Sequence, residues 1–159
     1  MCSTADGFTP WETYVGEPSP ANARQVERIS FSNADEDDYW SGLLVLRIQV
    51  FAGDADAFKL TLRLLKQSDG ALLEDLAQIS GLSIRVQPRQ FLVGVAAEEL
   101  PKRLLETIRN AAGEEYVDKP KARLYEMQMR RETLESIGDP SLQTIRDLCL
   151  SLLADRDGM

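Results

Sequence analysis

The feature that most constrains the fold is an alternation of apolar and polar residues in the middle of the chain. In residues 43–51 every second position is apolar, at Leu44, Leu46, Ile48 and Val50. Residues 57–66 repeat the pattern, at Phe58, Leu60, Leu62 and Leu64. A period of two with polar residues between is typical of an antiparallel strand with one buried face. We therefore expect a β-hairpin around a loop at residues 52–56.

Patterns elsewhere complete an α+β fold. Further strands are expected at residues 26–32, 82–87 and 91–95. Amphipathic helices are expected at residues 69–79, 98–112, 121–137 and 141–154. Gly81 ends the first of these helices, and Gly138, Asp139 and Pro140 separate the last two. The order predicts an antiparallel meander sheet of about four strands, with helices on one face and a C-terminal helical hairpin.

The length of 159 residues suits one domain, which the patterns divide into three parts. Residues 1–25 form an N-terminal arm or loop, residues 26–113 the α+β core, and residues 114–159 the helical hairpin. The arm is predicted from its prolines and glycines and its lack of any apolar period. The hairpin is expected to pack on the core or on a partner.

The sequence contains no histidine, which excludes several kinds of chemistry. Without imidazole there is no Ser-His-Asp or Cys-His catalysis and no histidine metal site. The glycine-rich GxGxxG and Walker A motifs of nucleotide-binding proteins are also absent. We therefore expect no catalytic residues, no metal and no cofactor, while an enzyme that relies on carboxylates remains open.

Location is predicted from features that the sequence lacks. The two cysteines, Cys2 and Cys149, do not make a disulfide framework. No apolar run is long enough for a membrane helix, and the first residues do not resemble a secretory signal. These features predict a cytoplasmic protein that does not contact membranes. Arginine outnumbers lysine 13 to 5, which indicates a GC-rich bacterial or phage source.

The net charge is −8, and part of it is concentrated in residues 33–38. Asn33, Asp35 and Asp37 match the first positions of a calcium loop. Asp38 and Leu44, however, stand where that loop needs a glycine and a bidentate glutamate. The segment is therefore interpreted as a solvated turn or as an acidic docking patch.

Aromatic residues lie near these charges and in the arm. The rings of the arm either pack back on the domain, dock on a partner, or belong to a disordered tail. Aromatic anchors favour interfaces, which supports the docking interpretation. The predicted partner-binding residues are Trp11, Tyr14, Asp35, Glu36, Asp37, Asp38, Tyr39 and Trp40.

Basic residues at the outward positions of the expected strands suggest a second kind of partner. If the strands pair, these residues share one sheet face that could hold phosphates. They are Arg47, Lys59, Arg63, Arg85 and Arg89. An ordinary polar face opposite the core is the favoured interpretation, because an acidic protein repels nucleic acid and these strands lack stacking aromatics.

The leading hypothesis is a non-enzymatic protein-interaction module: an adaptor, an inhibitor or immunity-type protein, or a chaperone. Its acidic surface would steer basic protein partners. Nucleic-acid binding through the basic sheet face is the alternative. In the helix at residues 121–137, Met127 lies on the core stripe while Tyr125 and Met129 face elsewhere, which favours homo-oligomerisation or a protein partner.

Overall fold

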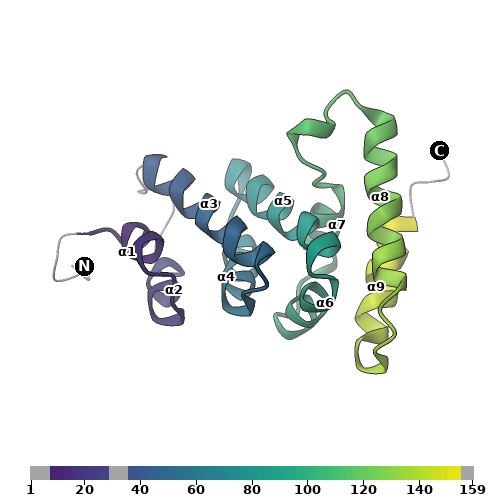
Figure 1. The fold of residues 1–159 in the computed structure, drawn as a ribbon, viewed down its shortest axis with the longest axis horizontal. Helices are drawn as coiled ribbons and strands as arrows, with labels where there is room; N and C mark the ends of the chain where they lie inside the picture. Colours follow the sequence, from purple (N-terminus) through teal and green to yellow (C-terminus); the bar gives the residue numbers. More distant parts are fainter. Residues whose placement is uncertain (1–7, 29–35, 155–159) are drawn as a thin grey trace.

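The computed structural model describes residues 8–28 and 36–154. Every regular element in these residues is helical, as Figure 1 shows. The α-helices are α1 (Pro10–Gly16), α2 (Pro20–Val26), α3 (Glu36–Phe51), α4 (Ala55–Gln67), α5 (Gly70–Val86), α6 (Pro88–Ala97), α7 (Lys102–Asn110), α8 (Pro120–Glu135) and α9 (Gln143–Ala154). The short 3-10 helices are η2 (Glu114–Tyr116) and η3 (Pro140–Leu142).

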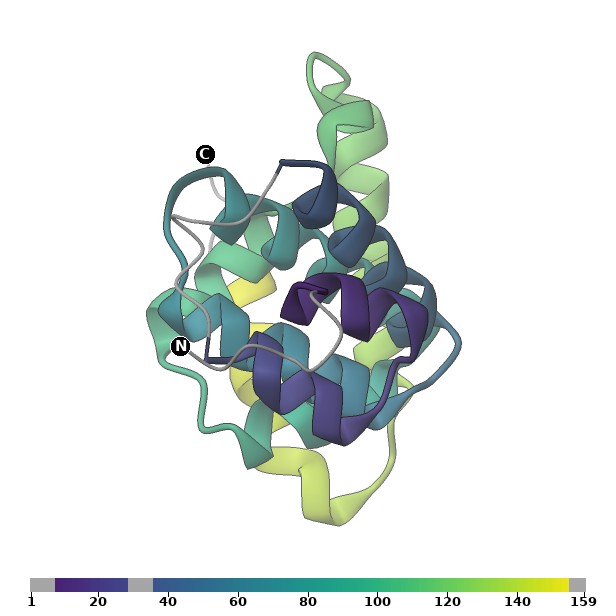
Figure 2. The same ribbon diagram turned by 90° about the vertical axis from the view of Figure 1, so that its left-hand side faces the viewer.

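The helices stack as successive hairpins along the long axis of the molecule, from α1 and α2 at one end to α8 and α9 at the other (Figure 1). One layer is made by α1, α3, α5 and α8, each packed on the next, and the other by α2, α4, α6 and α9. Helix α7 packs on α5 and α9. Such stacks bury a continuous core because each hairpin covers the apolar face of its neighbour. Figure 2, seen from the α1 end, shows α8 rising beyond the other helices.

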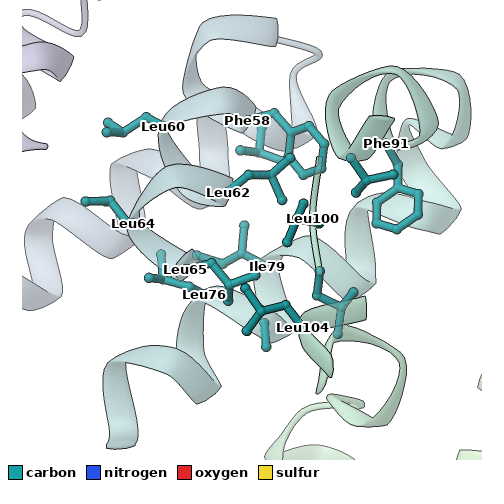
Figure 3. Close-up of a cluster of buried hydrophobic side chains, with 14 of the residues drawn as sticks. Phe58, Leu60, Leu62, Leu64, Leu65, Leu76, Ile79, Phe91, Leu100 and Leu104 are labelled. Atoms are coloured by element: carbon teal, nitrogen blue, oxygen red, sulfur yellow. The ribbon is translucent and has the colours of Figure 1, made fainter. Parts of the chain in front are cut away.

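Helix α4 lies at the centre of this core and is buried on most sides. Its buried apolar residues are Ala57, Phe58, Leu60, Leu62, Leu64 and Leu65. Phe58 approaches Phe91 of α6, with ring centroids 6.1 Å apart (Figure 3). Ile79 of α5 and Leu104 of α7 belong to the same cluster (Figure 3). A single core therefore runs through the hairpins.

The predicted α+β class is wrong, since no strand occurs in residues 8–28 or 36–154. Residues 43–51 lie in α3, residues 57–66 in α4, residues 82–86 in α5 and residues 91–95 in α6. Of the predicted strand at residues 26–32, Val26 ends α2, and residues 29–32 lie outside the described part. The antiparallel meander sheet is therefore replaced by a helical stack.

The strand prediction for residues 43–51 and 57–66 was wrong because both segments contain apolar residues at many spacings. Seven of the nine residues in 43–51 are apolar, so a period of two and a helical period both fit. In the structure Leu43, Leu46 and Val50 are buried at helical spacing, while Leu44 and Ile48 are exposed. In α4 the spacing of the polar residues indicates a helix. Lys59, Arg63 and Lys66 recur at i, i+4 and i+7 and mark one helix face.

Residues assigned to an N-terminal arm form α1 and α2. Thr9 caps α1: its hydroxyl accepts a hydrogen bond from the Glu12 amide, and the Glu12 carboxylate accepts one from the Thr9 amide. The Ser19 hydroxyl caps α2 by accepting a hydrogen bond from the Asn22 amide. Pro10 and Pro20 occupy the first turns, where a proline loses no helical hydrogen bond. The prolines that suggested a loop therefore mark helix starts.

Gly81 does not end a helix but lies inside α5, at a crowded crossing. A Cβ at this position would lie 2.7 Å from Nη1 of Arg130 and 2.9 Å from the Ile108 carbonyl oxygen. The glycine lets α8 and the end of α7 approach the α5 backbone closely. Gly81 therefore marks a close contact between helices and not the end of a helix.

Arg130 belongs to a buried ion-pair network that attaches α8 to the stack. Its Nε donates to Oε1 of Glu126 at 2.9 Å, and Nη1 of Arg85 donates to Oε2 of Glu126 at 2.7 Å. Arg130 also donates to the carbonyls of Ile108 and Ala111 at the end of α7. The last carbonyls of a helix lack the usual amide donor four residues on, and the guanidinium donates to two of them; the Ile108 carbonyl also accepts from the Ala111 amide at 3.3 Å. The network joins α5, α7 and α8.

Replacing Gly81 by alanine is expected to destabilise the protein. In a helix interior this change normally favours folding by about 1 kcal/mol, but the added methyl group would here push into Arg130 and the Ile108 carbonyl. We expect the free energy of unfolding to fall by about 1–3 kcal/mol in urea titrations followed by circular dichroism. Gly16→Ala is the control, because nothing lies within 4 Å of the added Cβ at the end of α1. Equal stability of the two variants would contradict the proposed crowding.

Replacing Glu126 by glutamine would leave the Arg130 guanidinium buried without a carboxylate. Breaking a buried ion pair on one side costs about 3–5 kcal/mol of unfolding free energy. The exposed Glu135 on the same helix provides the control, since Glu135→Gln should change stability by less than about 0.5 kcal/mol. Chemical denaturation of both variants distinguishes them, and a small effect for Glu126→Gln would argue against the network as the attachment of α8.

Candidate functional site

Helix α3 carries an exposed apolar stripe. Trp40, Leu44 and Ile48 follow one another at intervals of four residues, with exposed fractions of 54%, 59% and 55%. The opposite side of α3 packs into the core. At that side Gly42 lies so close to the Trp11 ring of α1 that a Cβ would come within 2.2 Å of it. Because α1 fixes the buried side, the stripe is held toward solvent.

A groove runs beside this stripe, between α3 and α5, with a volume of about 190 Å³. We call it the α3–α5 groove. Its walls are mainly apolar, with charged or amide groups at the rim. The lining residues are Trp40, Leu43, Leu44, Arg47, Asp75, Gln78, Ile79 and Leu82. Arg47 lies over the Phe51 ring, 5.6 Å from its centroid.

A second and larger concavity lies between α5 and the projecting half of α8, with a volume of about 570 Å³. We call it the α5–α8 notch. Its floor is α5, with Ala71, Glu74 and Ala77, and its far wall includes Tyr116, Val117 and Arg123. Figure 2 shows the projecting end of α8, the helix that carries Arg123. The end of α7 closes the notch on one side with Thr107 and Asn110.

The two concavities meet at a saddle formed by Trp40, Asp75 and Gln78, which line both of them. The Tyr39 hydroxyl donates a hydrogen bond of 2.6 Å to Oδ2 of Asp75. The Tyr39 ring meets the Trp40 ring edge to face, with centroids 5.1 Å apart. Burial, and then the hydrogen bond to Asp75, raises the pKa of Tyr39, so its hydroxyl keeps its proton. Tyr39 thus orients both the carboxylate and the indole.

The structure separates the predicted partner-binding residues. Tyr39 and Trp40 are at the saddle. Trp11 and Tyr14 are buried in α1, and Trp11 is only 1% exposed, so their rings pack back on the domain. Asp35 lies outside the described residues. Glu36, Asp37 and Asp38 form the start of α3, but their side chains also lie outside what the structure describes.

The five residues predicted to bind nucleic acid lie on four different helices and not on a sheet face. Arg63 pairs with Glu27 and Glu98, Arg85 with Glu126, and Arg89 with Asp139. Arg47 is at the rim of the groove, and Lys59 is exposed on α4. Three of these cations are therefore paired with carboxylates of this chain.

Helix α8 exposes apolar residues on its projecting half. Leu124 and Tyr125 are exposed, and Met127 and Met129 are half-buried. Leu124 and Met127 also line a cavity of about 280 Å³ that reaches Leu152 and Leu153 of α9. The face of α8 toward the stack instead carries Glu126, Arg130 and Leu134. Homo-oligomerisation through these C-terminal helices remains a prediction.

The described residues offer few groups for covalent or metal chemistry. Within them no three His, Cys, Asp or Glu side chains come together where they could hold a metal ion. Cys149 is buried, and burial raises the pKa of its thiol to about 12, so it stays protonated at neutral pH. None of the helices that the structure describes combines the length and apolar character needed to cross a bilayer.

The sequence analysis missed part of the site. Leu44 and Ile48 were predicted to be core, and Asp75 and Gln78 were not singled out. The available signal was the spacing of four from Trp40 to Leu44 and Ile48, which runs along one side of a helix.

Searches of protein-family models, of curated proteins and of solved structures find no match to this chain.

The two tryptophans should differ in their access to solvent. We expect acrylamide to quench the fluorescence of Trp40 strongly and that of Trp11 weakly, because only Trp40 is exposed. A Trp40→Phe variant should therefore lose most of the quenching and keep a shielded emission. If quenching persists unchanged in this variant, the exposed position of Trp40 is wrong.

Proposed function

We propose that this chain is a cytoplasmic, non-enzymatic protein-binding module that captures an amphipathic helix of a partner protein in the α3–α5 groove. The observation that carries the proposal is the exposed stripe of Trp40, Leu44 and Ile48 beside that groove. Large apolar side chains grouped at the surface commonly mark interaction sites. Adaptors, inhibitors or immunity-type proteins and chaperones all share such a role.

The spacing of the stripe supports a helical occupant. Ile48 follows Trp40 by eight positions in α3, which corresponds to about 12 Å along the helix axis. A partner helix with apolar residues at i, i+4 and i+7 presents a stripe of similar length and fits a groove between two helices. The ring of Trp40 at one end is the kind of aromatic anchor that dominates binding energy.

The charge of the chain favours a basic partner. A net charge of −8 attracts cationic surfaces over a distance and raises the rate of encounter. This attraction is screened by salt, whereas contacts in an apolar groove are not. Binding should therefore weaken, but not vanish, as the salt concentration rises.

The test compares proteins captured from a nuclease-treated native lysate by the wild-type chain and by a Leu44→Asp/Ile48→Asp variant. Both positions are exposed, so the variant should fold normally, as circular dichroism would verify. We expect the variant to lose the partners that the wild type retains, because Leu44→Asp places a charge in the groove and Ile48→Asp places one on the stripe beside it, and neither charge can be desolvated cheaply.

Val93→Asp is the matched control, since Val93 is an exposed apolar residue of α6 in the other layer. It should capture the same proteins as the wild type. Capture of the same proteins by the Leu44→Asp/Ile48→Asp variant and by the wild type would contradict the proposal. Recovery of nucleic acid in place of protein, without nuclease treatment, would favour the alternative of nucleic-acid binding.

A further inference from the structure

We propose that the saddle of Trp40, Asp75 and Gln78 receives one arginine side chain of the bound partner segment. The inference rests on the proposed function, because it names the chemistry that the partner presents where the groove meets the notch. It starts from a contrast among the carboxylates at the helix contacts of this chain.

Several carboxylates at these contacts are paired with a cation of the chain itself. Glu27 and Glu98 pair with Arg63, Glu126 pairs with Arg85 and Arg130, and Asp139 pairs with Arg89. Asp75 is also partly buried, but no cation of the described residues forms an ion pair with it. Its contact within the described chain is the Tyr39 hydroxyl on Oδ2. No donor of the described residues forms a hydrogen bond with the other oxygen, Oδ1.

The neighbours of Asp75 suit a cation. Trp40 is more than half exposed, and an indole face attracts a guanidinium placed within about 6 Å of its centre. Glu74, the adjacent residue of α5, is exposed in the notch and has no cationic partner in the described part of the chain. The saddle therefore offers a ring face, an oriented carboxylate and a second negative charge nearby.

Arginine fits this arrangement better than lysine. Gln78 follows Asp75 by three residues on α5, so the two side chains lie about 5–6 Å apart at Cβ on one helix face. A planar guanidinium can lie on the Trp40 ring while its edge donates to Oδ1 of Asp75 and to the amide oxygen of Gln78. An ammonium group is a compact point charge and cannot make all these contacts in one plane.

The cations of the chain itself leave the saddle open. Arg47 lies over the Phe51 ring, and it follows Trp40 by seven residues, about 10 Å along α3. Arg123, on the far wall of the notch, donates to the Asn110 carbonyl oxygen at 3.1 Å. The negative charge of Asp75 thus lies at the saddle, and the positive charges of Arg47 and Arg123 lie away from it. A partner segment with a central arginine matches this pattern.

The experiment titrates the 15N-labelled chain with N-acetyl-arginine N-methylamide and follows the indole N–H signal of Trp40 by NMR. The signal is assigned with a Trp40→Phe variant. We expect a saturable shift, and the neutral citrulline analogue should bind at least about tenfold more weakly because it keeps the shape but loses the charge. The lysine analogue should fall between the two. Equal shifts with arginine and citrulline would overturn the proposal, as would tighter binding of lysine.

Variants locate the effect on the saddle. Asp75→Asn should weaken arginine binding about tenfold, because it removes the charge at constant shape. Tyr39→Phe keeps the ring but releases Asp75, so Tyr39 acts as a positioning residue and its loss should weaken binding a few-fold. Asp56→Asn, the same change on an exposed residue of α4, is the control and should bind like the wild type. Unchanged binding in Asp75→Asn would overturn the assignment.

The outcome separates this inference from the proposed function. If the arginine compound fails to bind while partner capture still depends on Leu44 and Ile48, the groove function stands and the arginine subsite falls. If the compound binds at the saddle while the Leu44→Asp/Ile48→Asp variant captures the same proteins as the wild type, the subsite stands and the groove function falls.

Discussion

The buried pairing of Arg130 with Glu126 determines how the last hairpin joins the rest of the molecule. Helix α8 faces the stack with Glu126, Arg130 and Leu134, so two of its three buried residues are charged. A charge taken out of water is tolerated only when it is paired and its hydrogen bonds are satisfied. Here Arg85 and the end carbonyls of α7 complete the set. Burial lowers the pKa of Arg130 while Glu126 opposes that change, which is the expected balance for a paired buried guanidinium.

This network also shapes the candidate site. The hydrophobic effect is non-directional, whereas directed hydrogen bonds to the carbonyls of Ile108 and Ala111 fix the position of α8 along α7. The far wall of the α5–α8 notch therefore has a defined place. The α3–α5 groove has a different origin, since it follows from ordinary packing of α3 and α5 around Leu43 and Ile79. The two concavities meet where Trp40 and Asp75 lie.

Part of the fold and part of the site could be predicted from the sequence. The helix start at Asp139 and Pro140, where η3 leads into α9, could be predicted because capping chemistry is local. The Asp139 side chain accepts a hydrogen bond from the Ser141 amide. The helical structure of α3 and α4 could not be predicted from their apolar residues, because these residues fit both the strand period of two and the helical period of about 3.6. Trp40 could be singled out as an exposed aromatic candidate. Its partners Asp75 and Gln78 come from another hairpin, and only tertiary packing brings them to the same place.

The stacking of hairpins in chain order has a consequence for how the protein is made. Contacts lie mostly between helices that are adjacent or next but one in the sequence, and chains with such local contacts fold quickly. All residues that line the α3–α5 groove belong to positions 40–82, and the hairpin of α8 and α9 contributes none of them. During synthesis the groove segments leave the ribosome before α8 does. A nascent chain can therefore have its groove in place before the wall of the notch exists.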